Sequence, residues 1–175
     1  PNHNDKYRGR MRQWYALYCR PRQEARAYDN LQRQGFSLYH PKLRTLKQRR
    51  AGLTPVVESL FPRYLFIHLD DQADNWAPIR STRGVVDLVK VGGYPRPVPN
   101  HVIEQLASFQ VPDGYIDHCW ESDFKEGERL RVTGGPFAGN WVEFLERGGD
   151  ERVVVLLNIM HTLQKVEVPI ASVSR

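Results

Sequence analysis

The sequence has no uninterrupted run of about 18 apolar residues, the length that a membrane-spanning helix needs. Its beginning, PNHNDKYRGR, is polar and basic and lacks the apolar segment of a secretory signal. Cysteine is scarce, and Cys19 and Cys119 lie far apart. We therefore expect a reduced, cytoplasmic protein without membrane attachment, and we predict a disordered extension over residues 1–11.

Motifs for catalysis and cofactor binding are missing as well. The six histidines do not fall at ligand spacing around either cysteine, so we predict no metal site. The segment GGPFAG (134–139) lacks the Lys-Ser/Thr pair of a phosphate-binding loop. Paired carboxylates at motif spacing and Ser/His/Asp or Cys/His signatures are also absent from the sequence. We expect a protein that is not an enzyme and has no cofactor.

Charge is distributed unevenly along the chain. Residues 1–50 hold thirteen Lys and Arg against three Asp and Glu, a net charge of +10, so with +5 overall the remaining residues carry −5. A basic first part indicates a face for nucleic acid, and a solvated basic surface is the alternative. The 41% hydrophobic content suffices for a folded core in one or two domains.

Apolar periodicity predicts alternating strands and helices as far as residue 110. Strands are expected at 12–20, 36–50, 58–70 and 82–93, and helices at 22–34, 73–81 and 98–110. This order is typical of a ferredoxin-like α/β sandwich with an antiparallel sheet, an α+β fold. Residues 111–123 have no period and contain Pro and Gly, which indicates a linker. Short alternating runs between Gly clusters in 124–175 predict a small β-barrel.

The helix expected at 22–34 has two different sides. Ala27, Tyr28 and Leu31 form the side that would pack on the sheet. The other side carries long hydrogen-bond donors, which can hold phosphates or read base edges, although a plain solvated face gives the same pattern. These donors are Arg22, Arg26, Asn30 and Arg33, with Gln23 and Gln34 at the margin.

The strand ESLFPRYLFIHLD (58–70) is apolar on both faces. Since residues two apart share a face, Leu65, Ile67 and Leu69 point to one side and Tyr64 and Phe66 to the other. A small domain has one core, so the role of the aromatic side is open at this point: it is either an exposed docking patch or a face that helices of the same domain cover.

Several segments resemble one known family. WYALYCRPRQEARAYDNLQRQGF, ESLFPRYLFIHL and STRGVVDLVKVGG resemble the N-terminal (NGN) domain of the NusG family of transcription elongation factors. FKEGERLRVTGGPFAGNWVEF is similar to the C-terminal KOW module of that family. WYALYC, ESLFPRYLFI and VVVLLNIMHTLQKV are similar to its specialised RfaH-like paralogues. The resemblance implies an NGN domain over 12–110, a linker over 111–123, and a KOW domain over 124–175.

The resemblance also implies partners. RNA polymerase would be bound at the clamp helices of its largest subunit, with suppression of pausing and termination. The contact would be an exposed apolar patch, which we call the predicted patch: Phe61, Pro62, Tyr64, Phe66, Ile103 and Leu106. RfaH-like paralogues are recruited by the exposed non-template DNA strand. Asn30 stands where they carry His, and Arg20 where they carry Lys, so the recognised DNA element is left open. By position, the DNA-reading residues would be Arg20, Arg26, Asn30, Arg33, Gln34, Thr82 and Arg83.

The resemblance further implies that the C-terminal domain of RfaH-like proteins masks the patch as a helical hairpin. Glu58 and Arg152 stand at the positions of the salt bridge that holds this closed state. TGGPFAG (133–139) disfavours a continuous helix, at about 1 kcal/mol per Gly and about 3 kcal/mol for Pro, and VVVLL (153–157) favours a strand. We therefore expect an SH3-like barrel for the isolated domain, and the helical form is a hypothesis.

Two further interpretations follow from the resemblance. Family KOW domains also bind a small-subunit ribosomal protein, which implies coupling of transcription to translation. There are two alternatives to an operon-specific factor. One is a general NusG-type factor without sequence-specific recruitment, and the other is a ribosome-associated KOW protein. We expect a monomer in each case.

Overall fold

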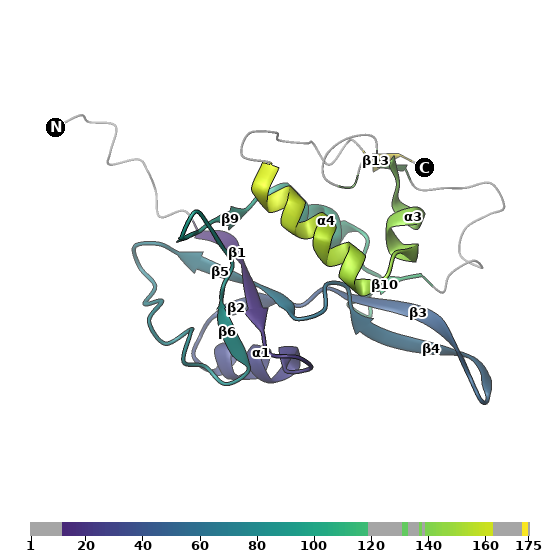
Figure 1. The fold of residues 1–175 in the computed structure, drawn as a ribbon, viewed down its shortest axis with the longest axis horizontal. Helices are drawn as coiled ribbons and strands as arrows, with labels where there is room; N and C mark the ends of the chain where they lie inside the picture. Colours follow the sequence, from purple (N-terminus) through teal and green to yellow (C-terminus); the bar gives the residue numbers. More distant parts are fainter. Residues whose placement is uncertain (1–11, 119–130, 133–136, 138, 163–172, 175) are drawn as a thin grey trace. The chain divides into compact units, whose positions relative to one another are not determined.

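The computed structural model describes residues 12–118, 131–132, 137, 139–162 and 173–174. Contacts gather in two compact units (Figure 1). Unit 1 is Pro1–His40 with Arg63–Val98, and unit 2 is Pro41–Pro62 with Pro99–Arg175. The predicted extension over 1–11 and Cys119 lie outside the described residues. The predicted domain boundaries at residues 110 and 124 stay a prediction.

Unit 1 is built on an antiparallel sheet in the order β2-β5-β1-β6, with β9 also paired to β1. The two central strands pair from Arg12 opposite Asp70 to Tyr18 opposite Tyr64. A short separate hairpin follows β6. The strands are β1 (Arg12–Cys19), β2 (Ser37–Tyr39), β5 (Tyr64–Asp70), β6 (Val85–Leu88), β7 (Lys90–Val91), β8 (Tyr94–Pro95) and β9 (Pro97–Val98).

Helix α1 (Glu24–Arg33) supplies the buried side that its sequence predicts. Ala27 and Leu31 are buried in a core cluster that also contains Leu65, Ile67 and Leu69 of β5. The helix is followed by Gly35 with φ +94°, a left-handed conformation that glycine adopts without a steric penalty. The predicted division of α1 and the aliphatic side of β5 are thus confirmed.

The helix predicted at 73–81 is wrong, because the described backbone forms turns there. The Ile79 N–H donates to the Trp76 carbonyl at 3.1 Å, a bond that spans three residues rather than four. The Asn75 side chain accepts from the Ala77 N–H at 3.1 Å. Pro78 has no N–H to donate. Since a side chain and a proline disturb the helical bonding, turns are formed instead.

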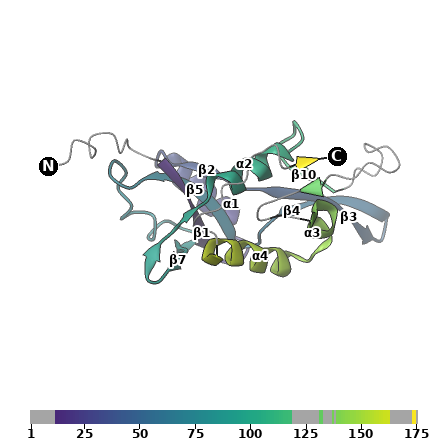
Figure 2. The same cartoon turned by 90° about the horizontal axis from the view of Figure 1, so that it is seen from above.

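Unit 2 contains a long hairpin, whose strands β3 (Lys42–Arg49) and β4 (Gly52–Ser59) run side by side in Figures 1 and 2. Strand β10 (Ile116–Asp117) adds to β3 in parallel. A small sheet has the order β12-β11-β13. The remaining elements are α2 (Asn100–Ser108), α3 (Trp141–Glu146), α4 (Gly149–Thr162), β11 (Arg131–Val132), β12 (Gly139–Asn140) and β13 (Val173–Ser174).

The described part of 124–175 does not form the expected barrel. Residues 141–146 and 149–162 are helices, as in the helical hairpin that the resemblance implied. The segment TGGPFAG precedes α3, so its glycines and proline do not interrupt either helix. On α4, Leu156, Ile159 and Met160 are buried at helical spacing. Burial of this side outweighs the strand preference of the valines before it.

Three further findings concern membrane-spanning helices, metal sites and the thiol of Cys19. In the part of the chain that the structure describes, no helix is both long and apolar enough to cross a membrane. Within the same residues, no group of His, Cys, Asp and Glu side chains is arranged to hold a metal ion. Cys19 is a buried free thiol, and burial raises the pKa of this thiol to about 12.

Candidate nucleic-acid and partner interfaces

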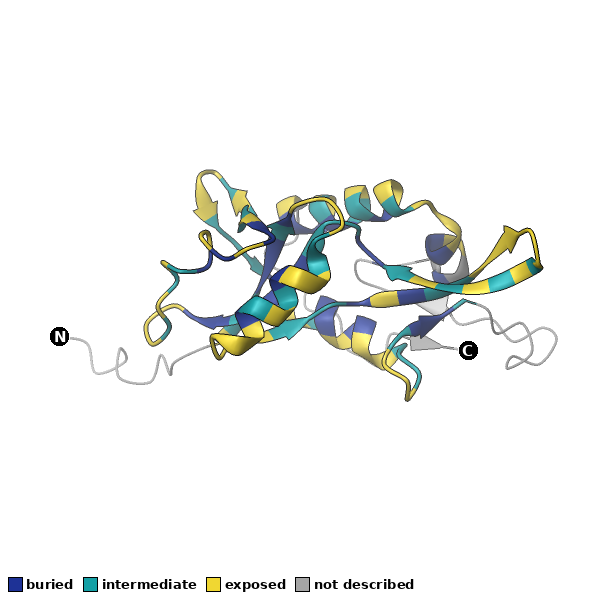
Figure 3. Cartoon of the chain, turned by 90° about the horizontal axis from the view of Figure 1, so that it is seen from below, coloured by how far each residue is buried: buried dark blue, intermediate teal, exposed yellow. Residues whose placement is uncertain are grey.

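The seven residues predicted to read DNA all lie in unit 1, and we call them the α1 surface. Figure 3 marks the exposed residues of α1 in yellow. Asn30 is half-buried and Thr82 is buried. The five exposed members, all with long side chains that donate hydrogen bonds, are Arg20, Arg26, Arg33, Gln34 and Arg83.

Thr82 holds Gln34 in place from within the α1 surface. The Gln34 amide donates from Nε2 to Thr82 Oγ1 at 2.9 Å. The Thr82 hydroxyl in turn donates to the Pro78 carbonyl at 2.8 Å. Because the hydroxyl is buried and already bonded, we interpret Thr82 as a residue that orients Gln34 rather than as a DNA contact.

Gly84 fixes the loop that carries Arg83 against the start of α1. The Arg20 N–H donates to the Gly84 carbonyl at 2.8 Å. Gly84 has φ +91°, and a Cβ added there would lie 2.9 Å from Ala27 N and from Gln23 O. Only glycine fits so close to the helix backbone. The backbone of the loop therefore lies against α1, and Arg83 directly precedes this contact.

The second face of the sheet in unit 1 carries paired rings. Trp14 stacks on His68 with ring centroids 4.5 Å apart, and Tyr18 lies 5.2 Å from Tyr64. Tyr39 of β2 lies 6.2 Å from Phe66. The sequence interpretation identified this face on β5 but missed its members on β1 and β2. The alternation of Trp14, Ala16 and Tyr18 is the signal that would have found those on β1.

The predicted polymerase patch is not exposed in this structure, which corrects that part of the prediction. Phe61, Phe66, Ile103 and Leu106 are buried, and Pro62 and Tyr64 are half-buried. Within unit 2, the ring of Phe61 lies 6.4 Å from Phe144 of α3.

The end of α2 also meets α3. Phe109, which directly follows α2, stacks on Trp141 with ring centroids 4.2 Å apart. Together with the contact at Phe61, this stack shows that α3 covers apolar residues on two different segments of unit 2.

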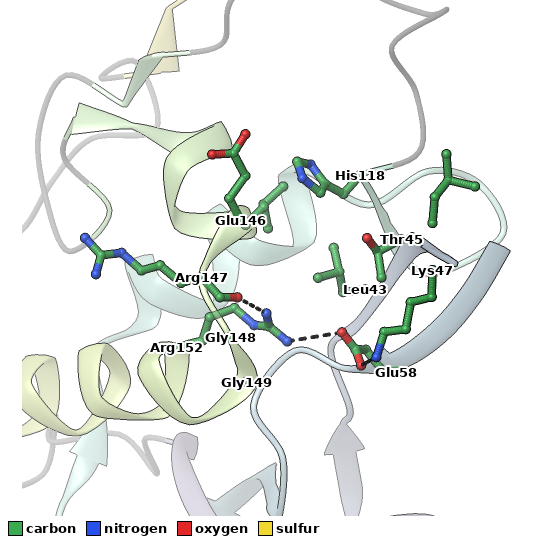
Figure 4. Close-up of a pocket in the computed structure, with 12 residues that line it drawn as sticks. Leu43, Thr45, Lys47, Glu58, His118, Glu146, Arg147, Gly148, Gly149 and Arg152 are labelled. Atoms are coloured by element: carbon green, nitrogen blue, oxygen red, sulfur yellow. Dashed lines mark hydrogen bonds and ion pairs between the residues drawn. The ribbon is translucent and has the colours of Figure 1, made fainter. Parts of the chain in front are cut away.

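Arg152 of α4 is bound by the last residues of β4 and by Leu60 directly after it, an arrangement that we call the Arg152 lock (Figure 4). Its side chain is 3% exposed. Nε donates to the Leu60 carbonyl at 2.7 Å, and Nη2 lies 3.5 Å from the Ser59 carbonyl. Nη1 donates to the Arg147 carbonyl, and Nη2 lies 3.6 Å from Glu58 Oε1. The two residues predicted to pair therefore do form an ion pair.

Glu58 contributes to this lock as a shared counter-ion. Burial lowers the pKa of Arg152. The neighbouring Glu58 carboxylate acts in the opposite direction and offsets part of this shift. Glu58 is 33% exposed and also accepts from Lys47 Nζ at 2.9 Å, closer than Arg152. The best hydrogen bonds of the buried guanidinium are thus to backbone carbonyls, and Glu58 balances part of its charge.

The start of α4 packs closely on the same segment. A Cβ added to Gly149 would lie 2.6 Å from Pro62 Cγ, so glycine allows this approach. A cavity of about 390 Å³ lies beside the lock, between the hairpin and the turn that joins α3 to α4 (Figure 4). Its charged lining consists of three cations and two carboxylates: Lys47, Arg147 and Arg152 with Glu58 and Glu146.

Part of the predicted linker is fixed to the hairpin. Arg44 of β3 forms an ion pair with the buried Asp117 of β10. Arg44 also donates to the Tyr115 hydroxyl at 2.5 Å and lies over that ring. The His118 N–H donates to the Arg44 carbonyl at 2.7 Å. Residues 115–118 are therefore bound to β3 by both backbone and side chains.

These features define a class of protein: an α+β module built on an antiparallel sheet, with exposed arginines on and beside one helix and paired rings on one face of the sheet. A family model described as "NusG: Transcription termination factor nusG" matches residues 12–107. The chain belongs to the NusG family.

Two curated relatives and one solved structure are similar to this chain. "Transcription termination/antitermination protein NusG" of Thermus thermophilus is 28% identical, over 83% of this chain and 89% of that protein. The protein of the same description from Deinococcus radiodurans is 28% identical, over 93% and 98%. A solved structure described as "Domain interaction in Thermotoga maritima NusG" aligns with a TM-score of 0.40 at 20% identity, covering 73% of this chain and 76% of that one.

Proposed function

We propose that this protein is an operon-specific transcription elongation and antitermination factor. It binds RNA polymerase at the clamp helices of the largest subunit, reads the exposed non-template strand, and suppresses pausing and termination. It acts by binding, without catalysis. Membership of the NusG family supports the role in transcription, and the names of the relatives support termination and antitermination.

The aromatic face is the proposed polymerase contact. Its paired rings offer the kind of surface into which amphipathic helices dock. An apolar face of this extent needs a cover in the free protein, because exposed apolar patches promote association. Phe61 of the predicted patch is buried beside Phe144 of α3, which supports a covered state for that part of the patch.

The α1 surface is the proposed DNA contact. Single strands are bound by cationic grooves and by planar groups on which bases stack, and the arginine side chain provides both properties. Four arginines contribute to this surface: Arg20, Arg26, Arg33 and Arg83. Because Asn30 is half-buried between them, we propose that it contributes to base discrimination while the arginines hold phosphates.

The Arg152 lock is the observation that carries the operon-specific part of the proposal. A factor that acts at every gene needs no regulated contact, such as the buried Arg152 that holds α4 against residues 58–62. A factor that waits for a DNA signal does need one, because we propose that the lock keeps Phe61 of the predicted patch packed on Phe144 of α3 until that signal is bound. On release, we propose that residues 124–175 adopt the barrel that their composition favours and bind a small-subunit ribosomal protein.

The test is a paused-elongation assay in which the non-template sequence is scanned base by base. We expect pause suppression to depend on particular bases, and Arg33→Ala to weaken it at least tenfold at a limiting factor concentration. Gln32→Ala is the matched control, since Gln32 is exposed on another side of α1. Equal suppression on all sequences would indicate a general factor instead.

A further inference from the structure

The side-chain amide of Gln105 in α2 is buried and has no hydrogen bond to the residues that the structure describes. Its side chain belongs to a residue that is 1% exposed. Neither its Oε1 nor its Nε2 has a hydrogen-bond partner among the described residues. A glutamine amide offers two donors and an acceptor, and native proteins seldom leave all of them unused in the interior.

The position of Gln105 relates it to the predicted polymerase contacts. Val102, Ile103, Gln105 and Leu106 are the buried residues of α2. At 100° per residue they span one arc, with Ile103 at one border and Gln105 at the other. Phe109 lies one turn beyond Gln105 and stacks on Trp141 of α3. Gln105 therefore belongs to the same buried side of α2 as two residues of the patch.

A methionine or leucine at this position would suit a permanently buried site better. An apolar side chain of similar size has no donors or acceptors that burial would leave unpaired, whereas burial of an unpaired amide costs free energy. The presence of an amide is explained if this side of α2 is buried only in one state. In the other state, the amide must find donors and acceptors.

We propose that Gln105 is a polar contact for the docked polymerase, left unpaired while the patch is covered. This inference rests on the proposed function, because it requires that the patch is alternately covered and docked. The polar partner fixes the register of an otherwise apolar contact. The unpaired amide also lowers the equilibrium constant for the covered state by roughly 5- to 150-fold. Less free energy is then needed to open the Arg152 lock.

The experiment compares Gln105→Met with wild type in the full-length chain. Methionine keeps the length of the side chain and removes its polar atoms. We expect hydrogen exchange of the α4 amides to slow by roughly 5- to 150-fold, because the covered state no longer contains an unpaired amide. Glu104→Met is the matched control, since Glu104 is exposed on the neighbouring position of α2. Gln105→Leu provides a second variant should methionine perturb folding.

Polymerase binding gives the second readout. In an Arg152→Met background, which opens the lock, adding Gln105→Met should weaken binding to core polymerase at least fivefold. Unchanged or faster exchange of α4, or unchanged binding in that background, would overturn the inference. Failure of the proposed closed state is seen separately: Arg152→Met alone would then change neither α4 exchange nor polymerase binding.

Discussion

Replacing Arg152 by methionine is the sharpest test of how α4 is held. Methionine keeps the apolar stem and the helix propensity but removes every hydrogen bond of the guanidinium. Two of those bonds are strong ones, to the Leu60 and Arg147 carbonyls, and a bond to a charged group contributes about 1.5–3 kcal/mol. Allowing for water that reaches the freed carbonyls, we expect a loss of about 3–5 kcal/mol.

Glu58→Gln should have a much smaller effect. The carboxylate is 33% exposed, lies 3.6 Å from Arg152, and is shared with Lys47. A partly exposed pair of this kind contributes at most about 1 kcal/mol. The two variants thus separate the buried carbonyl bonds from the ion pair, although both remove a part of the same lock.

Hydrogen exchange of the α4 amides measures both effects. We expect exchange to accelerate by about two to three and a half orders of magnitude in Arg152→Met, and by at most about fivefold in Glu58→Gln. Arg147→Met is the matched control: its side chain is 52% exposed, and its carbonyl remains. If Glu58→Gln accelerates exchange as much as Arg152→Met does, the ion pair holds α4 and the reasoning from the carbonyl bonds is wrong.

Three further predictions concern other parts of the chain. Gly84→Ala places a Cβ 2.9 Å from backbone atoms of α1, and we expect the free energy of unfolding, measured in urea, to fall by about 2 kcal/mol or more. The pKa of Cys19 rises from 9.0 to about 12 on folding, so above pH 9 the unfolded chain binds fewer protons than the native one. Stability should then fall by about 1.4 kcal/mol per pH unit between about pH 9 and 12, and Cys19→Ala should remove this part of the slope; an unchanged slope contradicts the burial argument. Asp117→Asn removes the charge that faces Arg44, and exchange of the His118 amide should accelerate roughly tenfold; equal exchange would mean that backbone pairing alone holds β10.

Local periodicity accounts for the parts of the fold that could be predicted. The two sides of α1 and the two faces of β5 follow from spacings of 3.6 and 2 residues. Gly35 marks the end of α1 because its positive φ suits glycine. The failure at 73–81 has a local cause too, since the Asn75 side chain bonds the backbone and Pro78 cannot donate.

The state of the C-terminal segment depends on contacts that spacing does not reveal. The valines of α4 favour a strand, and burial of Leu156 and Met160 decides for a helix. The bond from Arg152 to the Leu60 carbonyl joins positions far apart in the sequence, and it involves a backbone group that any residue could supply. Resemblance named Glu58 as the partner of Arg152, but it could not show that the carbonyls provide the closer contacts.

The docking of β10 on β3 changes the length of the tether that joins the hairpin to the C-terminal helices. If residues 111–118 were free, they could extend by about 26–29 Å, at about 3.3–3.6 Å per residue. With His118 bonded to Arg44, any excursion of the helices starts eight residues later in the chain. If the C-terminal segment is released, as we propose, a shorter tether raises its effective concentration near its former site. The ion pair between Arg44 and Asp117 would then contribute to how quickly an opened factor recloses, independently of how strongly the closed state is held.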